Sequence, residues 1–243
     1  VGIVSYGAYV PTWRIERSEL ANVSGESSMG GERSVASWDE DSLTMAVEAG
    51  LDCLAGIDPK EVDGVFFATV SSPFKEKQAA STIAAALDLR KDVYTCDVTT
   101  SLRSGTLAIK AAVDAVKAGS ARKVLVTAAD CRAAMPKSAS EQMFGDVAAA
   151  FLIGEGEVIA GIEGFSTLSN PVAGSWKREE DSFPQAFQPK VDRTYGVLND
   201  IPEAVRQLIE KCNVGIKDIS KFALYAPDAR GYVQLARLLG MDP

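Results

Sequence analysis

The sequence contains no histidine among its 243 residues. Because histidine is the side chain that most often serves as a general base at neutral pH, its absence excludes many acid–base mechanisms at once. Cysteine is scarce too: Cys53, Cys96, Cys131 and Cys212 are widely spaced, sit in apolar surroundings and form no CxxC pair. We expect reduced, mostly buried thiols and no metal site.

Basic clusters and long apolar runs are missing as well. The formal net charge is −8, and an acidic chain without a basic run is a poor partner for nucleic acid. No segment reaches the roughly 18 consecutive apolar residues of a membrane-spanning helix, and no charged-then-apolar leader opens the chain. We therefore expect a soluble, cytoplasmic protein with no membrane partner.

What the chain does contain is an alternation of apolar strands and helices. Hydrophobic side chains make up 47% of the residues, enough for the core of one domain or of one and a half. We expect strands at 2–10, 62–70, 93–98, 123–129 and 143–153, and helices at 16–23, 42–54, 77–87 and 104–116. Residues 158–165 are expected to pair with 143–153 as a hairpin. This order predicts a mostly parallel sheet with helices on both faces.

The composition changes after this region. Residues 166–189 are rich in Pro, Gly, Ser, Trp and Phe and show no clear period. This long loop, which carries Trp176 and Phe183, is a candidate lid or substrate wall. Beyond it we expect a helix at 191–212, a strand at 221–225 and a helix at 230–239.

The stretch around which the chain is organised is 96–109, where an apolar strand passes through a tight turn into a helix. A side chain at the apex of such a turn lies over the helix N-terminus, where free N–H groups and the helix dipole favour an anion or a thiolate. A cysteine there would have a lowered pKa and be a good nucleophile. The apex residue is Leu102, so the architecture for covalent catalysis is present and the nucleophile is not.

Four segments, in order, resemble the archaeal and bacterial hydroxymethylglutaryl-CoA synthases, a branch of the thiolase superfamily. They are residues 1–11, residues 38–41, the strand–turn–helix with Gly105-Thr106 at the start of its helix, and residues 144–150. The resemblance implies an α/β fold, the thiolase-like layered α-β-α-β-α sandwich of two similar halves. By that resemblance, 1–165 form the complete N-terminal half, 166–189 the irregular loop, and 190–243 the start of the C-terminal half. The rest of that half lies on a separate chain or in a missing region, or the protein is a natural fragment. We expect the first, because a sheet stopped after one strand would leave an open edge and an uncovered face.

The resemblance also assigns three catalytic positions. In these synthases a cysteine forms the acyl-enzyme, a glutamate is the general acid/base, and a histidine polarises the thioester oxygen. Leu102 stands at the cysteine's place, Val70 at the glutamate's, and Tyr225 at the histidine's, with Asp228 where an asparagine follows. Leucine cannot be a nucleophile, so covalent acyl transfer through residue 102 is excluded.

Other residues have both a functional and a structural interpretation. Tyr225 either donates a hydrogen bond to a carbonyl or alkoxide, with Asp228 as its orienting group or base, or it only fills space. Ser101 is a candidate substitute in the site but lacks a histidine to activate it. Arg103 binds an anionic ligand or partner carboxylate, or is simply exposed to solvent. Trp176 and the basic residues after it contact a CoA nucleotide, or form an ordinary surface loop.

Two functions remain open from the sequence. The first is an enzyme that acts on acyl-CoA thioesters by aldol or retro-aldol chemistry without a cysteine nucleophile, with no covalently bound cofactor. The second is a catalytically silent thiolase-like subunit or scaffold. The resemblance implies a homodimer, or a heteromer with thiolase-like and zinc-ribbon/OB-fold proteins. The fold by itself does not distinguish these functions.

Overall fold

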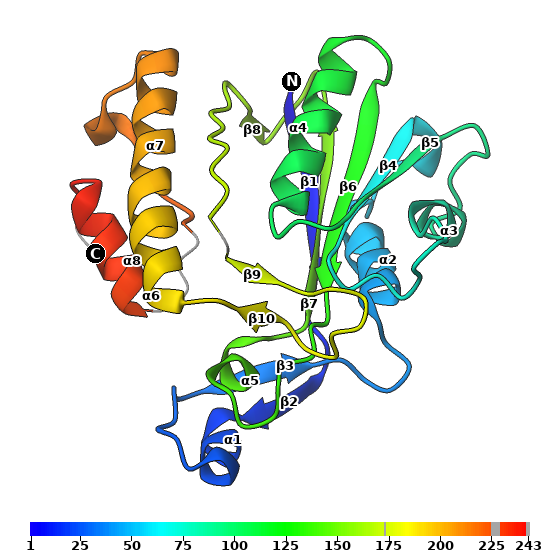
Figure 1. Cartoon of the computed structure of the whole chain (residues 1–243). Helices are drawn as coiled ribbons and strands as arrows, with labels where there is room; N and C mark the ends of the chain where they lie inside the picture. The colour runs from blue at the N-terminus through cyan, green and yellow to red at the C-terminus, as the bar shows by residue number, and fades with distance from the viewer. Residues whose placement is uncertain (173, 225–228, 242–243) are drawn as a thin grey trace. The chain divides into compact units, whose positions relative to one another are not determined.

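A computed structural model of the chain describes residues 1–172, 174–224 and 229–241 (Figure 1). Their contacts divide the chain into two compact units, Val1–Ile162 and Glu163–Pro243. Among the described residues, no helix is both long and apolar enough to cross a membrane.

The first unit is built on a six-stranded sheet with the strand order β5-β4-β6-β7-β1-β8. Strands β4, β5 and β6 run parallel, whereas β7 is antiparallel to both β6 and β1, and β8 is antiparallel to β1. The strands span Gly2–Tyr9 (β1), Gly64–Ala68 (β4), Tyr94–Val98 (β5), Lys123–Asp130 (β6), Val147–Gly154 (β7) and Ala160–Gly161 (β8).

Two expectations about this sheet were wrong. The sheet is mixed rather than mostly parallel, since only the pairings of β4 with β5 and with β6 are parallel. In addition, residues 158–165 do not form a hairpin with β7: only Ala160–Gly161 is a strand, and it pairs with β1. The physical reason is that both edges of β7 are already occupied, one by β6 and the other by β1.

Helices cover both faces of the sheet, as the sequence predicts. The helices α2 (Ser42–Cys53) and α3 (Ala80–Ala86) share a buried cluster with alternate strand residues such as Val65, Phe67 and Leu125. The intervening residues point the other way, and α4 (Ser104–Lys117) packs on β4 and β6. The sheet is therefore buried between helical layers, and the ends of its strands are what remain accessible for a site.

A small subdomain lies at one end of the sheet (Figure 1). It comprises β2 (Trp13–Glu16), α1 (Arg17–Ser24), β3 (Glu32–Val35) and α5 (Ala139–Met143). Buried Gln142 ties these parts together: its side-chain oxygen accepts from the N–H of Met29 at 2.9 Å, and its carbonyl accepts from Arg17 Nε at 2.8 Å. The 3-10 turn η1 (Pro59–Glu61) leads into β4.

The second unit is mainly helical. Its elements are β9 (Ser175–Trp176), β10 (Gln185–Ala186), α6 (Pro189–Val191), the π-helical turn η2 (Asp192–Val197), α7 (Leu198–Cys212), the 3-10 turn η3 (Ile216–Asp218) and α8 (Ala229–Leu238). The helix expected at 191–212 is thus divided by the π-helical turn. The expected strand at 221–225 is absent from its described part, 221–224. In the described part of this unit, β9 and β10 pair with each other, so residues 221–224 have no neighbouring strand with which to pair.

Candidate active site

The strand, turn and helix expected around Leu102 are present. Strand β5 ends at Val98, α4 begins at Ser104, and the turn is closed by the N–H of Ser104 donating to the carbonyl of Ser101 at 2.9 Å. Thr100 has a φ of 66°, an unusual conformation for a β-branched residue. Leu102 is 58% exposed at this turn. The leucine therefore occupies an accessible position next to a helix N-terminus.

The structure gives the neighbours of Leu102 local roles in the turn. The hydroxyl of Ser101 accepts a hydrogen bond from the N–H of Arg103 at 3.1 Å, which shapes the approach to α4. Arg103 is the N-cap residue of α4 and is exposed. The participation of either residue in chemistry or anion binding stays a prediction.

Val70 lies just beyond the carboxyl end of β4, next to β5. The preceding residue, Thr69, donates its N–H to the carbonyl of Val98 at 3.2 Å. The carboxyl ends of neighbouring parallel strands meet at one edge of a sheet, so the turn that carries Leu102 and the segment that carries Val70 start from the same edge. Both positions present apolar side chains there.

A polar cluster that the sequence did not reveal lies beside Val70. Asp130 is the last residue of β6, and its Oδ1 atom accepts three hydrogen bonds: from Thr69 Oγ1 at 2.9 Å, from the N–H of Val70 at 2.8 Å and from Ser71 Oγ at 2.8 Å. The only signal in the sequence was an acidic residue directly after the apolar run 124–129. Three donors on one oxygen fix the carboxylate and residues 69–71 in a single arrangement.

This cluster extends to α2 and to the segment after β6. Ser71 Oγ also accepts from the N–H of Cys131 at 3.0 Å, and its carbonyl accepts from Ser42 Oγ at 2.8 Å. Burial raises the pKa of Cys131 to about 11, with a contribution from the nearby charge of Asp146. A thiol with that pKa is protonated at neutral pH and is a poor nucleophile.

The cysteines are free in the structure, as expected, but they are less buried than expected. Cys53 is buried, whereas Cys96, Cys131 and Cys212 are only half-buried. Burial is also the main factor that raises the pKa of Cys96, and the charge of Asp97 adds to it. The raised pKa values disfavour the reactive thiolate form of both Cys96 and Cys131. No group of three or more Cys, Asp or Glu side chains among the described residues is arranged to hold a metal ion.

The predicted substrate wall belongs to the second unit. Trp176 lies in β9 opposite Gln185 of β10, and the carbonyl of Phe183 accepts a hydrogen bond from Gln185 Nε2 at 3.2 Å. Trp176 and Phe183 thus share one short hairpin within the loop 166–189. Their role in binding a substrate stays a prediction. Tyr225 and Asp228 lie outside the described residues.

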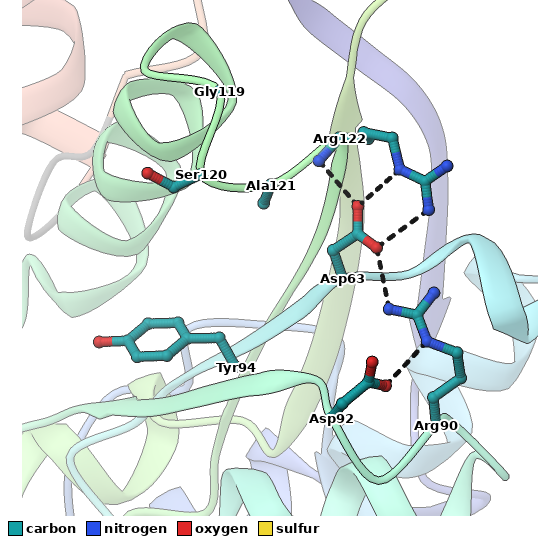
Figure 2. A pocket seen from close by; sticks show the side chains of 8 residues that line it. All are labelled: Asp63, Arg90, Asp92, Tyr94, Gly119, Ser120, Ala121 and Arg122. Carbon is teal, nitrogen blue, oxygen red and sulfur yellow. Dashed lines mark hydrogen bonds and ion pairs between the residues drawn. The ribbon is translucent and has the colours of Figure 1, made fainter.

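A pocket of about 360 Å³ lies at the other end of the parallel strands (Figure 2). Asp63 precedes β4, Tyr94 begins β5 and Arg122 precedes β6. The carboxylate of Asp63 accepts from Arg122 Nε at 3.2 Å and from Arg90 Nη2 at 3.0 Å. These hydrogen bonds, above all that from Arg122, hold the pKa of Asp63 well below its usual range. Asp92 accepts a further hydrogen bond from Arg90 Nε at 2.9 Å, so the carboxylates of Asp63 and Asp92 together balance the charges of Arg90 and Arg122. The cluster therefore acts as a structural clamp between strand ends.

Replacing Asp63 with asparagine should lower the free energy of unfolding at pH 7 by about 1–2 kcal/mol, because both arginines lose their shared carboxylate. A lowered pKa in the folded state stabilises the fold above the unfolded pKa of about 3.9, and this contribution is lost as the pH falls further. The difference between wild type and Asp63→Asn should therefore shrink below about pH 4. Urea unfolding between pH 7 and pH 3 measures it. Asp114→Asn, which breaks an exposed ion pair with Lys110, is the control. An equal loss of unfolding free energy in both variants would contradict the structural role of the Asp63 cluster.

Comparisons with known proteins agree with this architecture. Residues 25–150 match the family described as the thiolase N-terminal domain. Among solved structures, an HMG-CoA synthase complexed with CoA superposes with a TM-score of 0.89 at 19% identity, covering 99% of this chain and 63% of that one. A 3-oxoacyl-[acyl-carrier-protein] synthase III from Aquifex aeolicus gives 0.86 at 21% identity, covering 99% and 81%. The fold and the strand–turn–helix therefore define a thiolase-fold protein.

Relatives in sequence show which family of thiolase-fold proteins the chain belongs to. The hydroxymethylglutaryl-CoA synthase of Archaeoglobus fulgidus is 32% identical, across 100% of this chain and 73% of the relative. The synthase of Methanocaldococcus jannaschii is 31% identical, across 98% and 72%. The chain belongs to the hydroxymethylglutaryl-CoA synthase family, and it spans less than two thirds of the length of the solved HMG-CoA synthase.

Proposed function

We propose that this protein acts on acyl-CoA thioesters without forming an acyl-enzyme. The observation that carries the proposal is the strand–turn–helix with an exposed leucine, Leu102, at its turn, the position that the family resemblance assigns to the nucleophile. Relatives named as hydroxymethylglutaryl-CoA synthases support the thioester as the ligand class. So do structural neighbours described in complex with CoA and with 3-hydroxy-3-methylglutaryl coenzyme A.

The reaction type that fits these residues is formation or cleavage of a C–C bond by aldol or retro-aldol chemistry. Such a reaction needs a donor to the carbonyl or alkoxide oxygen and a base, but no covalent intermediate. By the family resemblance Tyr225 is the donor and Asp228 its orienting group or base. The fixed carboxylate of Asp130 beside Val70 adds an anionic group at the edge where β4 and β6 end.

A second candidate is a catalytically silent subunit of a heteromeric acyl-CoA complex. The observation in its favour is that Val70 and Leu102 are both apolar. By the family resemblance they stand at two of the three catalytic positions, where apolar side chains favour a silent chain. In this case a thiolase-like chain supplies the cysteine, or a zinc-ribbon/OB-fold protein delivers the substrate. Strand β5 lies at the edge of the sheet, which supports dimerisation through that edge with a second copy or a related chain. A cytoplasmic location stays a prediction.

Calorimetric titration with acetyl-CoA and a hydroxyacyl-CoA, combined with an assay of thioester cleavage, separates the two candidates. The enzyme should bind at least one thioester and turn it over, and Tyr225→Phe should reduce turnover by about 100-fold while binding persists, since only a hydrogen-bond donor to the reacting oxygen is lost. Binding without turnover would favour the silent subunit. If the protein neither bound nor turned over a thioester at millimolar concentration, the thioester proposal would be contradicted.

A further inference from the structure

The turn Ser37–Glu40, which connects the subdomain to α2, presents a tryptophan to solvent. Trp38 is 95% exposed, although tryptophan is highly buried on average in folded proteins. The N–H of Glu40 donates to the carbonyl of Ser37 at 3.1 Å, which closes the turn with Trp38 and Asp39 at its tip. Trp38 therefore contributes almost nothing to the core of this chain.

The carboxylate of Glu40 holds the turn in place through two hydrogen bonds. One oxygen accepts from the N–H of Ser37 at 2.6 Å, and the other accepts from the hydroxyl of Tyr9 at the end of β1. The hydrogen bond from Tyr9 to Glu40, with burial and the acidic neighbours, raises the pKa of Tyr9 to about 12. The tyrosine consequently stays a donor at physiological pH.

Both sides of the turn are anchored as well. On one side, Asp41 forms a capping box with Thr44, with two hydrogen bonds of 2.8 Å at the start of α2. On the other side, the N–H of Ala36 donates to the buried carboxylate of Asp146 at 2.8 Å. The backbone under Trp38 is thus ordered in advance, so little conformational entropy would be lost when this side chain binds a partner.

The segments next to the turn carry more exposed apolar side chains. Val10 directly follows Tyr9, Trp13 pairs with Val35 of β3, and Val147 directly follows Asp146; Val10, Trp13 and Val147 are all exposed. Aromatic side chains on fixed backbones, with apolar neighbours and a polar rim, are typical of the centres of protein interfaces.

The charge of the turn identifies the kind of partner. Trp38 is followed by Asp39, Glu40 and Asp41, and the whole chain carries a formal net charge of −8. Two copies meeting at this turn would bring six carboxylates together, three from each turn, which is unfavourable. A basic protein surface with a pocket for an aromatic ring is complementary in both charge and shape.

We propose that the Trp38 turn is a docking site for a basic protein, with Trp38 as its anchor and Asp39 and Asp41 as its acidic rim. This proposal does not depend on the thioester chemistry proposed above. It requires neither Leu102 nor any catalytic role of the chain.

The test begins with p-benzoylphenylalanine at position 38, which keeps an aromatic ring on the turn. The full-length chain is crosslinked by light in an extract of cells that naturally produce it, and the attached protein is identified by mass spectrometry and purified. Its dissociation constant is then measured with wild type, Trp38→Ser, Asp39→Lys and Tyr195→Ser. Tyr195 is a matched control because it is an aromatic residue, 64% exposed, in the other unit.

We expect a basic partner, a loss of affinity of about 30-fold or more for Trp38→Ser, and weaker, less salt-dependent binding for Asp39→Lys. Tyr195→Ser should bind like wild type. Because Trp38 is almost fully exposed, its substitution should leave the unfolding transition unchanged. Crosslinking only to a second copy of the chain, crosslinking to no protein, an acidic partner, or equal affinity of Trp38→Ser and wild type would each overturn the proposal.

Discussion

Replacing Gly7 with alanine is expected to destabilise the first unit by about 3 kcal/mol, near the upper end for overpacked sites. Gly7 lies in β1 opposite Ala150 of β7, at a point where α2 approaches the sheet very closely. A Cβ atom on residue 7 would lie 2.3 Å from the carbonyl oxygen of Ala49 and 2.3 Å from the N atom of Cys53. These are backbone atoms of a helix, so relief requires the whole of α2 to shift. Urea unfolding, analysed for both midpoint and slope, measures the loss.

A matched control comes from the same sheet. Gly161 lies in β8, and a Cβ atom there would meet no atom within 4 Å. Gly161→Ala should therefore change the free energy of unfolding by no more than about 0.5 kcal/mol. If both variants lost the same stability, the cause would be the strand glycine in general, and the close contact between β1 and α2 would not be what makes Gly7 necessary.

Replacing Leu102 with cysteine is expected to create the most reactive thiol in the protein. The new thiol would be exposed, next to the N-terminus of α4 and adjacent to Arg103, and both features lower a cysteine pKa. The existing Cys96 and Cys131 have raised pKa values instead. At pH 7 we expect residue 102 to react with iodoacetamide at least about 10-fold faster than these two thiols. Peptide mass spectrometry over time measures each rate separately.

Leu107→Cys is the appropriate control for this experiment. Leu107 is also exposed and lies on α4, but one turn further from its N-terminus, where the effect of the helix dipole has largely faded. Its thiol should react at the rate of an ordinary exposed cysteine. Equal rates at positions 102 and 107 would mean that the turn lacks the electrostatic features of a nucleophile site.

Several parts of this fold follow directly from local sequence. The apolar runs of β4 and β6 are long enough and uninterrupted enough to indicate buried strands. Asp41 and Thr44 supply both halves of a capping box, so the start of α2 is encoded within four residues. The turn before α4 is likewise local, which is why the position of Leu102 could be predicted.

Features that depend on contacts between distant residues could not be predicted from local sequence. The hydrogen bonds of Asp130 reach back about 60 positions to Thr69, Val70 and Ser71. The pairing of β8 with β1 depends on which edges of β7 are already filled, and that is decided by the sheet as a whole. The exposure of Trp38 could not be predicted either, because the hydrogen bond between Tyr9 and Glu40 that fixes its turn joins separate elements.

Intact-mass spectrometry shows directly whether an acyl-enzyme forms. The unmodified protein is incubated with acetyl-CoA, under conditions in which calorimetry shows binding, and is then quenched rapidly with acid. We expect a bound thioester and an unchanged protein mass, whereas Leu102→Cys should gain one acetyl group. An acyl adduct on the unmodified chain, at Ser101, Cys96 or any other residue, would contradict the claim that this protein acts on acyl-CoA thioesters without an acyl-enzyme.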